Sequence, residues 1–537
     1  MDRLFTYFYP IFWLISRLYF RTVNIAFNFV NHFIAKNAVD PIPTDGMGDL
    51  LKLSATKSAE MIRKGEITSS KLVQAYVNRI KQVNPQVNAV VTELFEEAIE
   101  ISENVDCYLA NLDRESDEFK QLSRNKPLLG IPCTIKDNLK VKGCVSLAGN
   151  KMFLNNEPNS EDAVLVKRLR DAGAIPLATT NLPFFANGSE AHNVVTGRSR
   201  NPYDLRRSPG GSSGGESALI ASAASLFGIG NDVGGSIRLP CYMCGIFGLK
   251  PSMDIVPVEG TILDPNSLTC ARVNVNGPMC RYAEDLGLVL RALVGEEFAT
   301  STLNINRRID TNNIKIFYME ELNNILAESM HPEPRAALRK AIGYCENKCG
   351  ICAHRIDLPM AHRVFELFCA IVVSDDMLTG KTKSLLRRSA LCIQKLGRYL
   401  LSGLDMAPIR LEFDLLSTMI LYGPEKIHDL QAKCEQLRQQ IISLLADDGV
   451  LFFPALPALA PYHRQTEFLQ FNIVYTCLFN ALRLPSLSCT LGIEPSSGLP
   501  VGIQVVGKPH SEALLIAVAK QLENGFGGWV PPGQAKT

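Results

Sequence analysis

Two glycine clusters that contain serine lie close together in the chain, and either could hold a nucleophile. The first is SPGGSSGGES at residues 208–217, and the second is GNDVGGSIR at residues 230–238. Glycines this dense weaken a helix or a strand, so the backbone must need something that only glycine allows. A phosphate-binding loop, a nucleophile on a tight turn and an ordinary flexible loop are the three explanations to compare.

Neither cluster matches a nucleotide-binding loop. A phosphate loop of the form GxxxxGK[ST] needs a lysine after its glycines, and none follows here. Gly228 and Gly230 have the spacing of a dinucleotide fingerprint, but Val233 stands where its third glycine belongs. The pattern GxSxG occurs twice in the first cluster, around Ser212 and Ser213, yet no downstream histidine stands in a recognisable catalytic context.

A lysine upstream of the clusters gives these serines a candidate base. Lys136 ends the apolar segment GIPCTIK, which predicts a strand over residues 130–136. A lysine considered alone at such a place ordinarily extends to solvent. A serine hydroxyl needs a base to become nucleophilic, and lysine serves as one when burial lowers its pKa from about 10.4 toward about 7–8. With two serine clusters downstream, the lysine therefore suggests a Lys–Ser–Ser arrangement.

The segments around these residues alternate between strand and helix patterns. Strands are predicted over residues 130–136, 174–180, 450–457 and 498–507, and helices over 55–64, 68–86, 161–173, 430–449 and 511–523. Ser54 is the predicted cap of the first of these helices and Gly65 its stop. The alternation indicates an α/β fold in which helices flank a sheet.

The composition limits the partners that the chain could have. Its 55 basic and 54 acidic residues give a net charge of +1, so there is no basic excess to neutralise nucleic acid phosphates. The 15 cysteines are odd in number and scattered, which favours reduced and mostly buried thiols. Cys345, Cys349 and Cys352 lie near His354, but their spacing does not match a standard zinc module and favours a helix-to-strand junction.

The first 35 residues differ from the rest of the chain. The segment LFTYFYPIFWLIS at residues 4–16 is nearly all apolar, and 11 of the 41 aromatic residues precede residue 34. Residues 4–20 would form about 25 Å of helix against a hydrocarbon core of about 30 Å. Asn24, Asn28 and Asn31 then share one helical face, which suits the membrane interface. A short span, an interfacial anchor and a cleaved signal peptide compete, and the lack of a clear cleavage site makes the last the weakest.

We therefore predict a hydrophobic membrane anchor over residues 1–39 and a folded catalytic body over residues 48–537, with a turn-rich linker between them. The expected localisation is membrane-associated. If the anchor spans the bilayer, Arg17, Arg21 and Lys36 place the body on the cytosolic side. The sequence leaves this orientation open.

Several motifs in one order resemble the amidase signature family from about residue 50 onward. They are GIPCTIKDNLKVKG, TNLPFFANGSEAHNVVTGRSRNPYD, SPGGSSGGES, GNDVGGSIRLPCYMCGIFGLKPS, GPMCRYAEDL and GLPVGIQVVG. Within the family, the aromatic N-terminal segment is most similar to the membrane-anchored fatty-acid amide hydrolases of the second type. The resemblance implies a central mixed β-sheet covered by helices on both faces, with an N-terminal hydrophobic membrane helix.

The resemblance also implies a role for each residue of the site. Lys136 would act as base and then acid, Ser212 would relay the proton, and Ser236 would attack the carbonyl carbon. The oxyanion hole would consist of the N–H groups of Val233, Gly234, Gly235 and Ser236, and the supporting residues would be Ser213, Asp232 and Arg238. A cis peptide is implied at Gly211–Ser212. Asn231 and Ser217 depart from the family's pattern, and we expect them to tune the site.

The implied reaction is hydrolysis of a lipophilic carboxamide through an acyl-enzyme, with no metal and no organic cofactor. The implied partners are this small-molecule substrate and a membrane, and not nucleic acid. Three alternatives remain open: an amidase of small polar or aromatic amides, a glutaminase-type component of an amidotransferase, and a non-enzymatic receptor on the same fold. Lys136, Ser212 and Ser236 are all in place, which argues against the receptor. A homodimer is consistent with this interpretation, and the oligomeric state stays open.

Overall fold

A computed structural model describes residues 2–34, 42, 47–263, 272–372 and 424–534 of the chain. Within these ranges the strands form one eleven-stranded sheet in the order β1-β3-β2-β6-β8-β7-β12-β13-β11-β9-β10, together with a small β4-β5 pair. The strands are β1 (Val90–Glu93), β2 (Ile131–Lys136), β3 (Ala174–Thr180), β4 (His192–Asn193), β5 (Gly197–Arg198), β6 (Phe227–Asp232), β7 (Phe247–Lys250), β8 (Val275–Cys280), β9 (Lys315–Tyr318), β10 (Ala353–Arg355), β11 (Gly449–Phe453), β12 (Ser486–Glu494) and β13 (Leu499–Val506).

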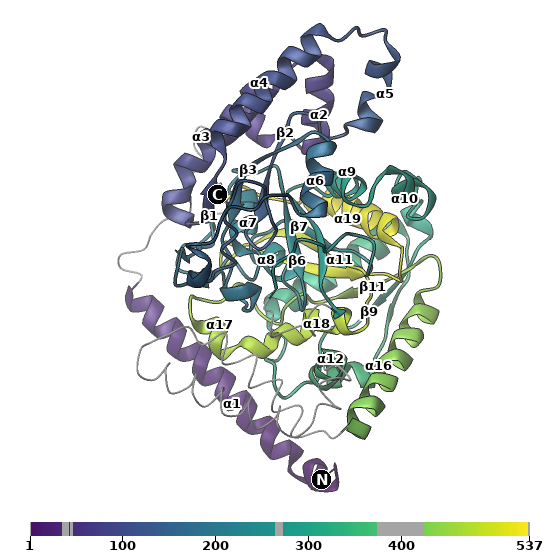
Figure 1. Cartoon of the computed structure of the whole chain (residues 1–537). Coiled ribbons are helices and arrows are strands. Elements are labelled where there is room, and N and C mark those ends of the chain that lie inside the picture. Colours follow the sequence, from purple (N-terminus) through teal and green to yellow (C-terminus); the bar gives the residue numbers. More distant parts are fainter. Residues whose placement is uncertain (1, 35–41, 43–46, 264–271, 373–423, 535–537) are drawn as a thin grey trace.

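The large sheet is mixed, as predicted. β2 pairs in parallel with both β3 and β6, and β9 pairs in parallel with both β10 and β11. The remaining pairs are antiparallel. Figure 1 shows the strands in the middle of the molecule with helices arranged around them. The α/β architecture expected from the alternating pattern is therefore confirmed.

In the described part of the chain, α-helices connect and cover these strands. They are α1 (Asp2–Ile34), α2 (Ala55–Lys64), α3 (Ser69–Val87), α4 (Phe95–Asn111), α5 (Asp117–Asn125), α6 (Val164–Asp171), α7 (Gly214–Ala221), α8 (Arg238–Met243), α9 (Ala283–Val294), α10 (Glu296–Ser301), α11 (Pro332–Cys349), α12 (Val364–Val372), α16 (Pro424–Leu445), α17 (Gln465–Phe468), α18 (Val474–Ala481) and α19 (Glu512–Phe526).

The predicted bounds agree closely with those of α2, α3 and α19, whereas α6 and α16 differ from their predictions by two to six residues at each end. The Ser54 side chain caps α2 by accepting from the Lys57 N–H, and Gly65 ends the helix in the left-handed conformation at φ 76°. α3 extends through Pro85 to Val87, slightly beyond its predicted end. β11 stops at Phe453, earlier than predicted, because Pro454 has no N–H to continue the ladder.

The parallel pairing of β2 and β6 brings the candidate chemistry to one edge of the sheet. Thr134 pairs with Gly228 and Ile135 with Ile229, so both strands point the same way. Lys136 is the last residue of β2 and Asp232 is the last of β6. Polar side chains that follow adjacent parallel strands meet at their carboxyl ends, which is where open α/β sheets place their sites.

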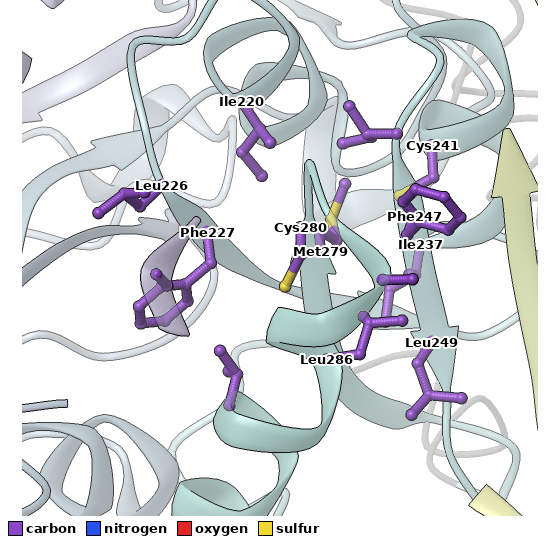
Figure 2. Packing of buried hydrophobic residues seen from close by; sticks show 14 of the residues in the cluster. Ile220, Leu226, Phe227, Ile237, Cys241, Phe247, Leu249, Met279, Cys280 and Leu286 are labelled. Atoms are coloured by element: carbon purple, nitrogen blue, oxygen red, sulfur yellow. The ribbon is translucent and has the colours of Figure 1, made fainter. Parts of the chain in front are cut away.

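The hydrophobic core beneath this edge holds the second glycine cluster in place. Figure 2 shows Ile237 among buried apolar side chains of β6, β7 and β8. A Cβ atom at Gly230, Gly248 or Gly277 would lie only 3.1, 2.9 or 3.2 Å from the Ile237 side chain. Each of three neighbouring strands thus has a glycine at the place where Ile237 packs. This packing fixes the backbone of the turn that precedes Ile237 against the sheet.

The N-terminal segment forms one long helix, α1, along the outside of the body (Figure 1). The expectation of a membrane-spanning helix is not supported, because none of the helices in the described ranges is both long and apolar enough to cross a bilayer. Arg17 and Arg21 interrupt the apolar run of α1, and several asparagines follow them. Most of the predicted linker at residues 40–49 lies outside the described residues.

The cysteines are thiols wherever the structure describes them, and most are buried. Cys345 and Cys349 lie in α11, and Cys352 directly precedes β10. The predicted helix-to-strand junction at this cluster is confirmed.

Candidate active site

Lys136 and Ser212 lie in contact inside the protein. The Lys136 Nζ donates to the Ser212 Oγ at 2.6 Å, and it also donates to the Asn231 Oδ1. Both Lys136 and Ser212 are fully buried. A buried amine in direct contact with a serine hydroxyl is the arrangement that the sequence suggested for a base and its partner.

Burial also changes the protonation of this lysine. It lowers the pKa of Lys136 to about 7, although the carboxyl groups of Asp232 and Glu216 act in the opposite direction. Glu216 is buried on α7, where it accepts from the hydroxyls of Thr134 and Thr180. Burial raises the pKa of Glu216 to about 8. The amine is therefore available in its neutral form near neutral pH.

The glycines of the first cluster are required because the backbone there packs closely against neighbouring backbone. The peptide bond Gly211–Ser212 is cis, as the resemblance implied. A Cβ at Gly211 would lie 2.5 Å from the Gly188 carbonyl oxygen, and one at Gly215 would lie 2.5 Å from the Asn181 nitrogen. A side chain at either position would push this segment away from the backbone that supports it.

The second glycine cluster has a different requirement. Gly235 has a φ of +132°, and a Cβ there would lie 2.2 Å from the Thr476 Oγ1 of α18. The Thr476 hydroxyl donates to the Gly234 carbonyl at 2.7 Å. α18 therefore presses directly on the turn that carries Ser236, and only glycine permits that contact.

The carboxylate of Asp232 organises the same turn. It accepts from the N–H groups of Gly235 at 2.7 Å and Ile237 at 3.1 Å, and it forms a fully buried ion pair with Arg238. Burial alone would raise the pKa of Asp232, but the Arg238 guanidinium outweighs that effect and holds the pKa well below its ordinary value. Arg238 in turn donates to the Thr476 carbonyl and to Asn480.

This geometry distinguishes the four N–H groups predicted for the oxyanion hole. The Gly235 N–H points to Asp232, whereas those of Val233, Gly234 and Ser236 form no hydrogen bond with the described part of the chain. The Ser213 N–H donates to the Ser236 carbonyl at 3.2 Å, which joins the two glycine clusters. The Ser236 hydroxyl has no hydrogen-bond partner among the described residues, and the Ser213 hydroxyl is also buried without one.

A pocket lined mostly by apolar side chains lies near the turn that carries Ser236. Its apolar lining includes Leu239, Met243, Leu456, Leu459, Leu469 and Ile473. Glu328 and Asn472 provide polar groups in the wall. Leu239 belongs to α8, and its N–H donates to the Gly235 carbonyl, so the pocket begins next to the turn.

Sequence reasoning missed several residues that hold the site together. Thr476 and Asn480 lie in α18, more than two hundred residues after Ser236, in a segment without a recognisable motif. Glu216 stood inside the first cluster and was not assigned a role. Asn231 was identified only as a departure from the family, and its contact with Lys136 was not predicted.

Comparisons with known proteins identify the family of the chain. The pattern of the family described as Amidase matches residues 71–516. Human fatty-acid amide hydrolase 2 is 36% identical over 500 residues, which cover 90% of this chain and 91% of that protein. One component of the glutamyl-tRNA(Gln) amidotransferase of Sulfurihydrogenibium is 27% identical, over 89% of this chain and 98% of its own.

A solved structure of a fatty acid amide hydrolase shares the fold. It has a TM-score of 0.71 and 24% identity, and the match covers 89% of this chain and 86% of that one. The family match spans most of the chain and includes both glycine clusters and Lys136. The chain therefore belongs to the amidase signature family and is an amide-hydrolysing enzyme.

Proposed function

We propose that this enzyme hydrolyses fatty-acid amides through an acyl-enzyme, using Lys136, Ser212 and Ser236. The observation that carries the proposal is the buried contact of the Lys136 Nζ with the Ser212 Oγ at 2.6 Å. The neutral amine would accept the Ser212 proton while it donates to Asn231. Ser212 would take the proton of Ser236, whose oxygen attacks the amide carbonyl carbon.

The developing charge on the carbonyl oxygen would be stabilised by backbone donors of the nucleophile turn. The N–H groups of Val233, Gly234 and Ser236 supply these donors, while that of Gly235 is bound to Asp232. One such donor typically contributes about 3–4 kcal/mol to the transition state. The proton then returns from Lys136 through Ser212 to the leaving nitrogen, the C–N bond breaks, and an ester on Ser236 remains.

Water would complete the reaction at that ester. Lys136, neutral again after protonating the leaving group, accepts a proton from water through Ser212 as the water oxygen attacks the acyl carbon. The bond to Ser236 breaks, the serine regains its proton, and a carboxylic acid leaves. The same residues thus act in both halves, first as base and then as acid.

A lipophilic substrate is supported by the pocket and by the relatives. The apolar wall formed by side chains such as Met243, Leu456 and Leu469 suits an alkyl chain. Three relatives that are 33–36% identical are named fatty-acid amide hydrolase 2, 2-A or 2-B. Each methylene of the chain placed in such a pocket adds about 0.8 kcal/mol of favourable burial.

Attachment to a membrane is part of the proposal. We divide the chain into an anchor over residues 1–39 and a catalytic domain over residues 48–537. The large apolar side chains exposed on α1 include Ile11, Trp13, Leu14, Ile15, Leu18, Ile25, Phe29, Val30 and Phe33. A helix that presents such a surface binds at the interface of a bilayer with its apolar face in the lipid.

A chain-length series tests the proposed substrate class. Hydrolysis of primary amides of 4, 8, 12 and 18 carbons is followed by the release of ammonia, with Ser236→Ala as the control. We expect kcat/KM to rise steeply with chain length and to vanish in the variant. A preference for the shortest amides would contradict the lipid assignment and leave the amidase chemistry in place. Turnover of glutamine only in the presence of other proteins of a complex would favour an amidotransferase instead.

A further inference from the structure

Among the side chains that join α1 to the catalytic body, Asn24 uses both ends of its amide. The Asn24 Nδ2 donates to the Glu328 Oε1 at 2.6 Å, and the Asn24 Oδ1 accepts from the Gln465 Nε2 at 2.7 Å. Arg17, two turns earlier, donates to the carbonyls of Asn324 and Ala327 at 3.0 Å. This side of α1 therefore faces protein.

Glu328 is the centre of this junction. Its side chain is 2% exposed, and its second oxygen accepts from the Asn472 Nδ2 at 2.6 Å. The Glu328 N–H donates back to the Asn472 Oδ1 at 3.0 Å, and His331 lies 3.3 Å from the same carboxylate. A buried carboxylate needs its donors, because removing one leaves a charged oxygen without compensation.

The junction forms part of the substrate pocket. Glu328 and Asn472 both lie in its wall, together with Leu469. Leu469 is buried against Phe20 and Val23 of α1, and Phe27 lies against Phe468 with ring centroids 5.7 Å apart. The segment over residues 465–472 is thus held between α1 and the body.

The same wall continues to the nucleophile turn. Ile473 directly follows Asn472, and its Cδ1 lies 3.3 Å from the place where a Cβ of Gly234 would be. The Thr476 hydroxyl lies 2.7 Å from the Gly234 carbonyl oxygen and 3.0 Å from the Ile473 carbonyl oxygen, so its single proton bridges the two. Packed side chains therefore connect α1 to the turn that carries Ser236.

We propose that α1 supports one wall of the acyl-chain pocket from outside, and that Asn24 is a positioning residue for the distal part of the substrate. The proposal rests on the proposed function, because it assigns this pocket to a long alkyl chain. Asn24 fixes Glu328 and Gln465, and these residues fix the segment that the chain contacts. A short amide fills only the space beside Ser236 and does not depend on that segment.

The test compares Asn24→Ala with Asn28→Ala in the full-length enzyme on phosphatidylcholine vesicles. Asn28 lies one turn later on α1 and is exposed, so it is a matched control. We expect Asn24→Ala to raise KM for oleamide about tenfold, as the loss of a hydrogen bond to a charged group would. The kcat for oleamide, both kinetic constants for hexanamide and vesicle binding should stay at wild-type values.

Exchanging the amide and the carboxylate between positions 24 and 328 gives a second test that does not depend on deleting a side chain. Asn24→Asp places two carboxylates together and should raise KM for oleamide more than the alanine variant does. Adding Glu328→Gln restores one carboxylate and one amide in reversed positions, and should recover most of the loss. Recovery by the double variant would tie the effect to this contact.

Two results would overturn the proposal while the proposed function stands. One is an Asn24→Ala enzyme that matches Asn28→Ala on oleamide, which would make α1 an attachment helix only. The other is an equal loss on oleamide and hexanamide through kcat, which would indicate general disruption of the fold. A wild-type enzyme that hydrolyses hexanamide and not oleamide would contradict the lipid assignment itself, and the inference with it.

Discussion

The Lys136 Nζ lies 2.6 Å from the Ser212 Oγ, and both residues are 0% exposed to solvent. This contact links the end of one strand to the loop before a helix, 76 residues apart in the sequence. A lysine at the end of a strand ordinarily extends to solvent, whereas this one is buried against a serine hydroxyl that it could deprotonate.

Replacing the lysine should remove the base and keep the fold. Lys136→Met has a similar length and suits a buried site, so the thermal midpoint should not fall. We expect kcat/KM to fall about 10³-fold, within the range for loss of a general base. Amide hydrolysis and thermal unfolding would be measured beside Lys142→Met, which alters an exposed lysine nearby. Near-normal turnover by Lys136→Met would show that another group is the base.

The dependence of kcat/KM on pH should follow the deprotonation of the Lys136 amine. The pKa of Lys136 is lowered to about 7, and the base must be deprotonated, so kcat/KM should rise with pH through about 7 and level off above it. Burial raises the pKa of Glu216 to about 8, so its carboxyl is mostly protonated while Lys136 titrates, and Glu216→Gln should leave this limb close to its wild-type position. A limb that moves to lower pH in this variant would show that Glu216 is ionised beside the amine.

Asn231 should set how readily the lysine loses its proton. Asn231→Asp places a carboxylate against the Nζ, which favours the ammonium and should shift the limb upward by about one unit or more. Activity at pH 7 should fall about tenfold and recover at pH 9. Asn231→Ser keeps a neutral acceptor and should remain near wild type. Equal profiles for the two variants would refute the contact between Asn231 and the amine.

Ile237 should support both stability and catalysis. Its side chain is fully buried in the niche formed by Gly230, Gly248 and Gly277. Ile237→Ala should lower the free energy of unfolding by about 2–5 kcal/mol, because it leaves a cavity. It should also lower kcat, since Ser236 precedes it. Urea unfolding and steady-state kinetics measure both, and Ile237→Val should lose much less of each. An Ile237→Ala enzyme that is less stable but keeps the wild-type kcat would show that the packing of Ile237 does not position the turn that carries Ser236.

The exposed apolar face of α1 should determine membrane binding. Phe29 and Phe33 are 62% and 59% exposed. Phe29→Glu combined with Phe33→Glu should release the protein from vesicles in a flotation assay, because charged groups are costly in the acyl region. Met152→Glu changes an apolar residue of the body that is 79% exposed, more than either phenylalanine, and should leave binding intact. Retained flotation of the double variant would place the membrane contact elsewhere.

The sequence predicted those parts of the fold that local patterns encode. The cap at Ser54, the stop at Gly65 and the strand ending at Lys136 were all expected, because each depends on a few adjacent residues. The cis peptide at Gly211–Ser212 came from the resemblance to a family, and the structure contains it. The membrane-spanning form of the N-terminal helix was the expectation that the structure did not support.

The parts that sequence reasoning missed depend on long-range packing. Thr476, in a helix without a recognisable motif, lies in close contact with Gly235. Asn24 forms a hydrogen bond with Glu328, which is 304 residues away in the sequence. The resemblance assigned the N–H groups of Val233, Gly234, Gly235 and Ser236 alike to the oxyanion hole. Gly235 instead owes its identity to its backbone angle and to Thr476, and its N–H is bound to Asp232.

Labelling with a fluorophosphonate probe tests the central assignment most directly. The probe reacts with an activated serine, and peptide mass mapping identifies the residue that it modifies. We expect a single adduct on Ser236, with labelling lost in Ser236→Ala and strongly slowed in Lys136→Met. An adduct on Ser213, or labelling that persists in Ser236→Ala, would contradict the Lys136–Ser212–Ser236 mechanism.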